Sequence, residues 1–100
     1  MDNLEKLSEI FKALSDPTRL RIIKMLSDCS SMLCVNAITN QLDVTQSAVS
    51  QHLRVLRQAG FVHSERRGYF IHYAINQDAF NDLNELQKKV LGLELEDKSV

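Results

Sequence analysis

The stretch 45-TQSAVSQHLRVLR-57 carries the clearest structural pattern in this chain. Thr45 is a good N-cap, and the residues after it combine apolar side chains at helical spacing with polar side chains on the other faces. We therefore predict an amphipathic helix over residues 46–59. The apolar positions, at steps of four and three, are Val49, Leu53 and Leu56.

The sequence continues as 58-QAGFVHSERRGYFIHYAI-75, which predicts a β-hairpin. Gly60 suits the left-handed position that closes a helix. Residues 61–66 and 69–75 are rich in aromatic and β-branched side chains, and Arg67-Gly68 between them is typical of a tight turn. A two-residue turn there would pair Arg66 with Tyr69.

Three further helices precede this stretch. The first ends near Leu14 and the second begins at Pro17, because proline fits the first helical turn. A short helix over 35–42 and a turn over 43–45 lead into the helix at 46, and these form a helix-turn-helix. With a last helix after Asp78, the chain is predicted to be mainly α with a small β-hairpin: a winged helix-turn-helix of four helices, two strands and a fifth helix.

The second helix of that motif and the hairpin tip are candidates for DNA contact. Short hydroxyl and amide side chains near a helix N-terminus suit base edges in the major groove, whereas arginines suit phosphates or a minor groove. Taken by itself, the polar side of the helix at 46–59 could instead be an ordinary solvent-exposed face without a binding role. The candidate DNA-binding residues are Thr45, Gln46, Ser47, Ser50, Gln51, Arg54, Arg66 and Arg67.

Charge is distributed unevenly along the chain. The net charge is −1, yet four arginines stand against the single acid Glu65 between residues 45 and 73. Phosphate binding depends on the charge of one face rather than on the total, so double-stranded DNA is an acceptable partner.

Length and composition limit the other possibilities. One hundred residues that are 44% apolar suit one folded domain, expected over 1–93, with a mobile tail over 94–100. The acidic N-terminus is unlike a secretory signal and no apolar run has the length of a membrane span, so a cytoplasmic protein without membrane contact is expected. No phosphate loop, zinc-ligand pair or activated nucleophile is recognisable, so neither enzymatic activity nor a cofactor is expected.

The chain from Phe11 to Ile75 resembles the ArsR/SmtB family of winged-helix repressors. The residues that carry this resemblance are ALSDPTRLRII at 13–23, LCV at 33–35, VTQSAVSQHLRVLRQAGFV at 44–62 and RRGYFIHY at 66–73. The resemblance implies a homodimer whose first and last helices pair, an inverted-repeat operator, and repression relieved by an inducer.

Two apolar stripes are compatible with that dimer, although they could instead cover the core of a single chain. The stripes lie on the first and last helices. Their residues are Leu4, Leu7 and Phe11, and Leu83, Leu86 and Val90.

The sequence departs from the metal-sensing pattern of the family. Where a Cys-Val-Cys-Asp unit is expected, it has 34-CVNA-37, and one thiol cannot bind a soft ion alone. On the last helix the expected zinc-ligand positions hold Gln77, Ala79, Val90 and Leu93, none of which binds Zn(II).

Other sensing chemistry stays open. Cys29 and Cys34 could form a disulfide or bind a thiophilic species, or be incidental. The expected hairpin register would place His63 opposite His72, a pair that lacks a third metal ligand. His52 is read as a packing or hydrogen-bonding residue. The predicted function is that of a repressor whose inducer is unknown and could be a thiol-reactive species or a redox change. The alternatives are a constitutive DNA binder and a winged helix that binds an acidic protein.

Overall fold

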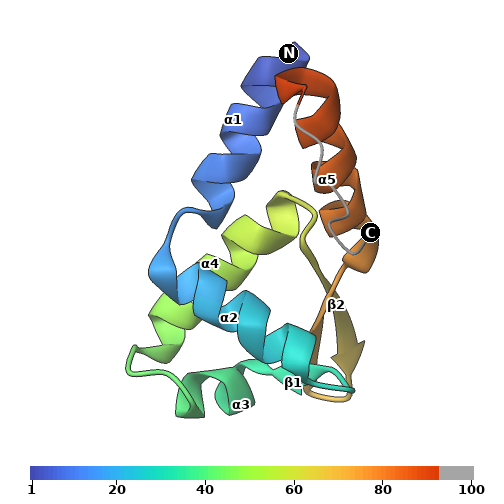
Figure 1. Cartoon of the computed structure of the whole chain (residues 1–100). Coiled ribbons are helices and arrows are strands. Elements are labelled where there is room, and N and C mark those ends of the chain that lie inside the picture. Colours follow the sequence, from blue (N-terminus) through green and yellow to red (C-terminus); the bar gives the residue numbers. More distant parts are fainter. Residues whose placement is uncertain (93–100) are drawn as a thin grey trace, which may run out of the picture.

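The computed structural model describes residues 1–92 as five helices with a small sheet at one side of the molecule (Figure 1). The elements follow the predicted order, with one additional strand. They are α1 (Asn3–Leu14), α2 (Pro17–Asp28), β1 (Leu33–Cys34), α3 (Val35–Asn40), α4 (Gln46–Gln58), β2 (Val62–Arg67), β3 (Phe70–Ile75) and α5 (Gln77–Leu91). The predicted winged helix-turn-helix is confirmed; the predicted tail over 94–100 lies outside the described residues.

The boundaries of the first two helices match the sequence signals. Asp2 caps α1 by accepting a hydrogen bond from the backbone N–H of Glu5 at 2.8 Å. Asp16 caps α2 in the same way, and Pro17 occupies its first position. These caps satisfy N–H groups that have no partner inside the helix, which is why α1 and α2 are separate helices.

The helix-turn-helix consists of α3 and α4. Thr45 accepts a hydrogen bond from Ala48 N–H at 3.1 Å, so α4 begins at Gln46 as predicted. α3 is shorter than predicted, ending at Asn40 instead of Leu42. The N–H of Leu42 bonds to the carbonyl of Thr39 at 3.0 Å, a three-residue turn that replaces the next helical turn.

The sheet has the strand order β1-β3-β2, and its register differs from the one expected. Arg67 pairs with Phe70, so the two turn residues are Gly68 and Tyr69. Of the two, only Gly68 has a positive φ (+65°), the pattern of a type II′ turn, which places glycine first. The expected pairing of Arg66 with Tyr69 is wrong because it would place Arg67 in that left-handed position.

The corrected register separates the two histidines. His63 lies opposite Ala74, and His72 lies between Glu65 on β2 and Cys34 on β1. The expected opposition of His63 and His72 is therefore wrong. Within residues 1–92 no three His, Cys, Asp or Glu side chains gather in a way that could hold a metal ion.

Two hydrophobic clusters hold the domain together. The larger one joins the helix-turn-helix to the sheet, and its members include Ile22, Ile38, Val49, Leu53, Leu56 and Val62. The smaller one, Leu7, Phe61 and Leu83, joins α1 and α5 to the base of the hairpin. α1 and α5 thus form one half of the molecule, and α3, β1 and the hairpin tip lie in the other half (Figure 1).

None of the helices within residues 1–92 combines the length and the apolar character that crossing a bilayer requires.

Candidate nucleic-acid interface

The N-terminal half of α4 presents a polar face fixed by the core behind it. Val49, Leu53 and Leu56 are completely buried, with 0% of each residue exposed. Because these side chains lock the rotation of the helix, the polar residues between them must point to solvent. All five are exposed, and none of their side chains takes part in the hydrogen bonds within residues 1–92: Gln46, Ser47, Ser50, Gln51 and Arg54.

Thr45 differs from the other predicted contact residues because its oxygen already has a structural role. It caps α4, so it fixes the start of the helix as well as lying at the exposed end of it. The free N–H groups of this first turn point outward and favour an anion such as phosphate.

The wing is attached rigidly to the end of α4. Gly60, with φ +88°, ends the helix in a Schellman motif: its N–H bonds to Arg57 O at 3.0 Å, and Phe61 N–H bonds to Leu56 O at 2.9 Å. The side chain of Asn76 then donates to Gly60 O at 2.8 Å. These bonds fix the hairpin relative to α4.

Phe61 secures the same junction from the apolar side. It is 1% exposed, and its ring meets that of Phe80 edge-on with centroids 4.8 Å apart. The base of the wing is therefore tied both to α4 and to α5.

The two wing arginines lie on opposite faces of β2, since alternate residues of a strand point to opposite sides. Arg66 Nε donates to Gly68 O at 3.2 Å, which holds this side chain against the turn. Arg67 pairs with Glu65, with the nitrogen 3.3 Å from the carboxylate oxygen. Exposed ion pairs of this kind are weak, so Arg67 can exchange Glu65 for a phosphate at little cost.

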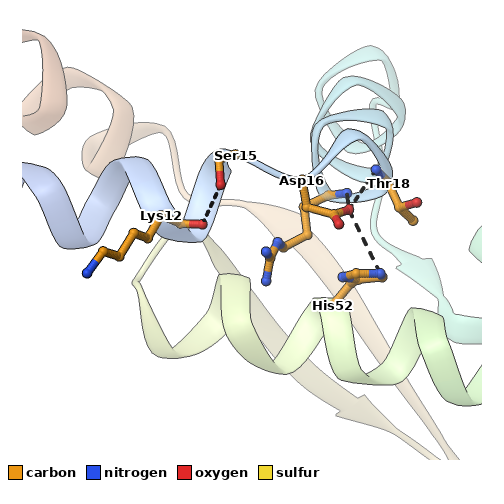
Figure 2. A network of polar contacts seen from close by, with 6 residues as sticks. Lys12, Ser15, Asp16, Thr18 and His52 are labelled. Atoms are coloured by element: carbon orange, nitrogen blue, oxygen red, sulfur yellow. Dashed lines mark hydrogen bonds and ion pairs between the residues drawn. The ribbon is translucent and has the colours of Figure 1, made fainter.

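His52 connects α4 to the start of α2 (Figure 2). Its Nε2 lies 3.9 Å from Oδ1 of Asp16, and both side chains are partly buried. The same oxygen accepts hydrogen bonds from the N–H groups of Arg19 and Thr18, at 3.1 and 2.8 Å. The bond from Arg19 is the main reason why the pKa of Asp16 is below its usual value, and the bond from Thr18 lowers it further, against a smaller opposing effect of burial.

The sequence indicated a role for each of Asp16 and His52 but not the contact between them. Asp16 is recognisable as a helix start and His52 as a polar neighbour of the helix core, but no local pattern links them. Their contact makes His52 a link between α4 and the start of α2 rather than a member of the exposed polar face of α4.

The two thiols are free and partly buried. Cys29 follows the last residue of α2, and its sulfur lies 3.8 Å from the hydroxyl oxygen of Ser31. Cys34 lies in β1, opposite His72 on β3. The structure thus places the thiols on a loop and on a strand.

The predicted dimerisation residues divide into two groups. Leu7 and Leu83 are buried in the core of the chain itself, and Leu86 and Val90 pack partly against that core. Leu4 and Phe11 remain 62% and 43% exposed. The two exposed residues, with Leu91 of α5, border a shallow hollow between α1 and the end of α5.

A helix-turn-helix followed directly by a wing, with an unpartnered polar face on its second helix, defines a winged-helix DNA-binding transcriptional regulator. Comparison with known proteins identifies the family. The family model described as "Bacterial regulatory protein, arsR family" matches residues 16–64. The chain belongs to the ArsR family.

Individual relatives agree with this assignment over most of the chain. The HTH-type transcriptional regulator MJ1325 of Methanocaldococcus jannaschii is 41% identical over 86 residues, which is 86% of this chain and 96% of the relative. The transcriptional repressor SdpR of Bacillus subtilis is 32% identical, covering 76% of this chain and 82% of the relative.

A solved structure shows the same fold. It is the homodimeric winged helix-turn-helix DNA-binding domain Mb0332 from Mycobacterium bovis, solved by NMR, with a TM-score of 0.70 and 26% identity. The match covers 97% of this chain and 88% of that one.

Proposed function

We propose that this protein is a homodimeric transcriptional repressor that binds an inverted-repeat operator. The observation that carries the proposal is the exposed polar face of α4, whose side chains have no partner within residues 1–92. In this role Gln46, Ser47, Ser50 and Gln51 contact bases or phosphates in the major groove. Arg54 contacts phosphate from the next turn of the helix.

The wing extends the same contact. Arg66 and Arg67 act from opposite faces of the hairpin, and the hydrogen bonds at Gly60 and Asn76 keep the hairpin at a fixed position beside α4. A rigid connection matters because phosphate contacts set the orientation of the reading helix on the duplex.

The exposed apolar residues of α1 and α5 supply the dimer contact. Leu4, Phe11 and Leu91 are large, exposed and gathered around one hollow, which favours burial against a second copy. The homodimeric state of the similar domain Mb0332 supports this arrangement. Two α4 helices related by a two-fold axis would then read two half-sites about one helical turn apart.

The dimer contact can be tested in solution. Phe11→Asp should shift the protein toward monomer in analytical ultracentrifugation, because a carboxylate would be buried in the contact. Leu20→Asp is the matched control, since Leu20 is 52% exposed on α2 and outside the proposed contact. An unchanged sedimentation coefficient for Phe11→Asp would contradict this choice of contact surface.

The inducer is proposed to act on the thiols, by oxidation or by a thiophilic species. Cys29 and Cys34 follow each other closely in the chain, on either side of a short loop that leads from α2 into β1. A covalent link between them would strain the start of α3 and so the helix-turn-helix.

One titration tests these proposals together. Fluorescence anisotropy is measured on a duplex from the protein's own upstream region, with the protein reduced, oxidised, or mixed with Zn(II) or As(III). Binding lost on oxidation or with the thiophile, and retained when both cysteines are serine, would establish the thiol switch. Binding indifferent to every addition would leave a constitutive DNA binder, and no salt-dependent binding to any duplex would favour a protein-interaction module.

A further inference from the structure

A hollow of about 490 Å³ lies between the end of α2, the loop that follows it, and the sheet. Small-molecule sites in proteins usually measure about 300–1,000 Å³, so this hollow has the size of a binding site. Its lining combines apolar and polar side chains. The apolar ones include Leu26, Met32 and Ile75, and the polar ones include Cys29, Ser31 and Arg67.

Cys29 supplies this hollow with a nucleophile. Its sulfur lies 3.8 Å from the hydroxyl oxygen of Ser31. Cys29 also borders a second hollow, on the side of α3, but Ser31 lines only the first one. The contact with Ser31 therefore places the thiol at the first hollow. Among residues 1–92, Cys29 is the only cysteine that lines it.

The charge of the hollow favours an anionic ligand. Arg67 lines it, and no aspartate or glutamate of residues 1–92 does. Arg67 uses one nitrogen, Nη2, for its exposed contact with Glu65 at 3.3 Å. A guanidinium has five N–H donors in a planar fork, so the remaining donors can bind a second carboxylate.

We infer that this hollow binds a low-molecular-weight disulfide that carries a carboxylate on an apolar body, and that Cys29 attacks the bound disulfide. The apolar side chains contact the body of the ligand, and Arg67 pairs with its carboxylate. The inference rests on the proposed thiol switch and deepens it, because it names the class of inducer and the thiol that reacts first.

The reaction is a thiol–disulfide exchange. The Cys29 thiol releases its proton to water, and the thiolate attacks one sulfur of the ligand. The bond between the two ligand sulfurs breaks as a new disulfide forms between Cys29 and one half of the ligand. The other half leaves as a thiolate. Cys29 is oxidised and the departing half is reduced, so no further oxidant is needed.

The retained half of the ligand would act on DNA binding through Arg67. Its carboxylate stays beside the guanidinium and competes with phosphate for it. If both chains of the dimer carry the adduct, two phosphate contacts are lost, and the slope of log K against log salt should become shallower by about 2.

Thiol kinetics test the site without DNA. The full chain with Cys34→Ser has one thiol, and its reaction is followed by the absorbance of the released probe. The probes are the dicarboxylate disulfide dithiobis(nitrobenzoate) and the neutral disulfide dithiodipyridine. Adding Arg67→Met should slow the dicarboxylate probe by about fivefold, the rate equivalent of a good exposed ion pair, and change the neutral probe by less than about twofold.

Arg21→Met is the matched control, because Arg21 borders the second hollow beside Cys29 and the same charge is removed. It should leave both rates within about twofold. In urea all variants should react equally, since the hollow requires the folded chain. In the unmodified protein, peptide mapping after brief exposure should find the dicarboxylate probe on Cys29 before Cys34.

The outcomes separate this inference from the proposed function. Equal slowing of both probes by Arg67→Met, or no slowing, would overturn the anion site. Slowing by Arg21→Met instead would overturn its placement in this hollow, and first reaction at Cys34 would overturn the role of Cys29. An adduct on Cys29 that leaves DNA affinity and its salt dependence unchanged would overturn the inducer role alone. Failure of the unmodified protein to bind any duplex would overturn the proposed function, whatever the thiol kinetics.

Discussion

Removing Arg54 should reduce the salt dependence of DNA binding by a predictable amount. The proposed interface has three cations per chain, Arg54, Arg66 and Arg67, and so six in a dimer. Each neutralised phosphate contributes about 0.9 to the slope of log K against log salt, which gives a slope of about −5 for the dimer. Affinity should then fall about a thousandfold between 50 and 200 mM salt.

Arg54→Ala removes two of these contacts per dimer. The slope should become shallower by about 2, and the loss of affinity over the same salt range should drop to about a hundredfold. The exposed position of Arg54, without a hydrogen bond within residues 1–92, means that the substitution should leave stability nearly unchanged.

The assay is fluorescence anisotropy on one specific and one scrambled duplex over a series of salt concentrations. Gln51→Ala is the control, since it removes a neutral neighbour on the same face and should leave the slope unchanged. Weaker binding by Arg54→Ala with an unaltered slope would refute the reasoning, because it would show that Arg54 contacts no phosphate.

The remaining predictions concern specificity, wing charge, stability and pH. Gln51→Ala should reduce discrimination between operator variants by about 1–3 kcal/mol, measured by competition binding; equal losses on every sequence would remove Gln51 from the reading set. Glu65→Gln should strengthen binding to random duplex by releasing Arg67, and unchanged affinity at low salt would show that the ion pair does not compete with phosphate. Leu53→Ala should lower the free energy of unfolding by about 2–5 kcal/mol in urea denaturation, and a loss under about 1 kcal/mol would contradict its complete burial. The pKa of Asp16 is lowered on folding, so its ionised form stabilises the fold above the unfolded pKa of about 4. This stabilisation is lost as the pH falls through the lower folded pKa. Asp16→Asn should therefore have a lower melting temperature than the unmodified protein at pH 7, and the difference should shrink in acid.

Local signals were sufficient for most of the helical structure. The cap at Thr45 and the spacing of Val49, Leu53 and Leu56 predicted both the start of α4 and the face it buries, because one helix can bury only one continuous stripe. Pro17 fixed the start of α2 for an equally local reason.

Non-local pairing was beyond the sequence. β1 has only two residues and forms because β3 pairs with it, so no alternating pattern in the sequence predicts it. The hairpin register depended on whether Gly68 came first or second in the turn, which composition alone does not decide. For β1 the deciding contact joins residues that are distant in the chain, Leu33 and Tyr73, whereas for the hairpin a shift of one position within the turn changes every pair of the two strands.

The apolar stripes of α1 and α5 show the same limit. Periodicity identified Leu4, Leu7 and Phe11 as one face of a helix, but the packing of α5 determines that Leu7 is buried in its own chain and that Leu4 and Phe11 are left exposed. The contact of His52 with Asp16 likewise required the tertiary structure.

A DNase I footprint of the reduced protein over its own upstream region tests the central claim most directly. A homodimer reading DNA through α4 should protect one defined site that contains an inverted repeat, with its half-sites about one helical turn apart. The protection should weaken when Gln51 is replaced by alanine. Uniform protection of the whole fragment, or no protection at low salt, would contradict the account of a sequence-specific repressor.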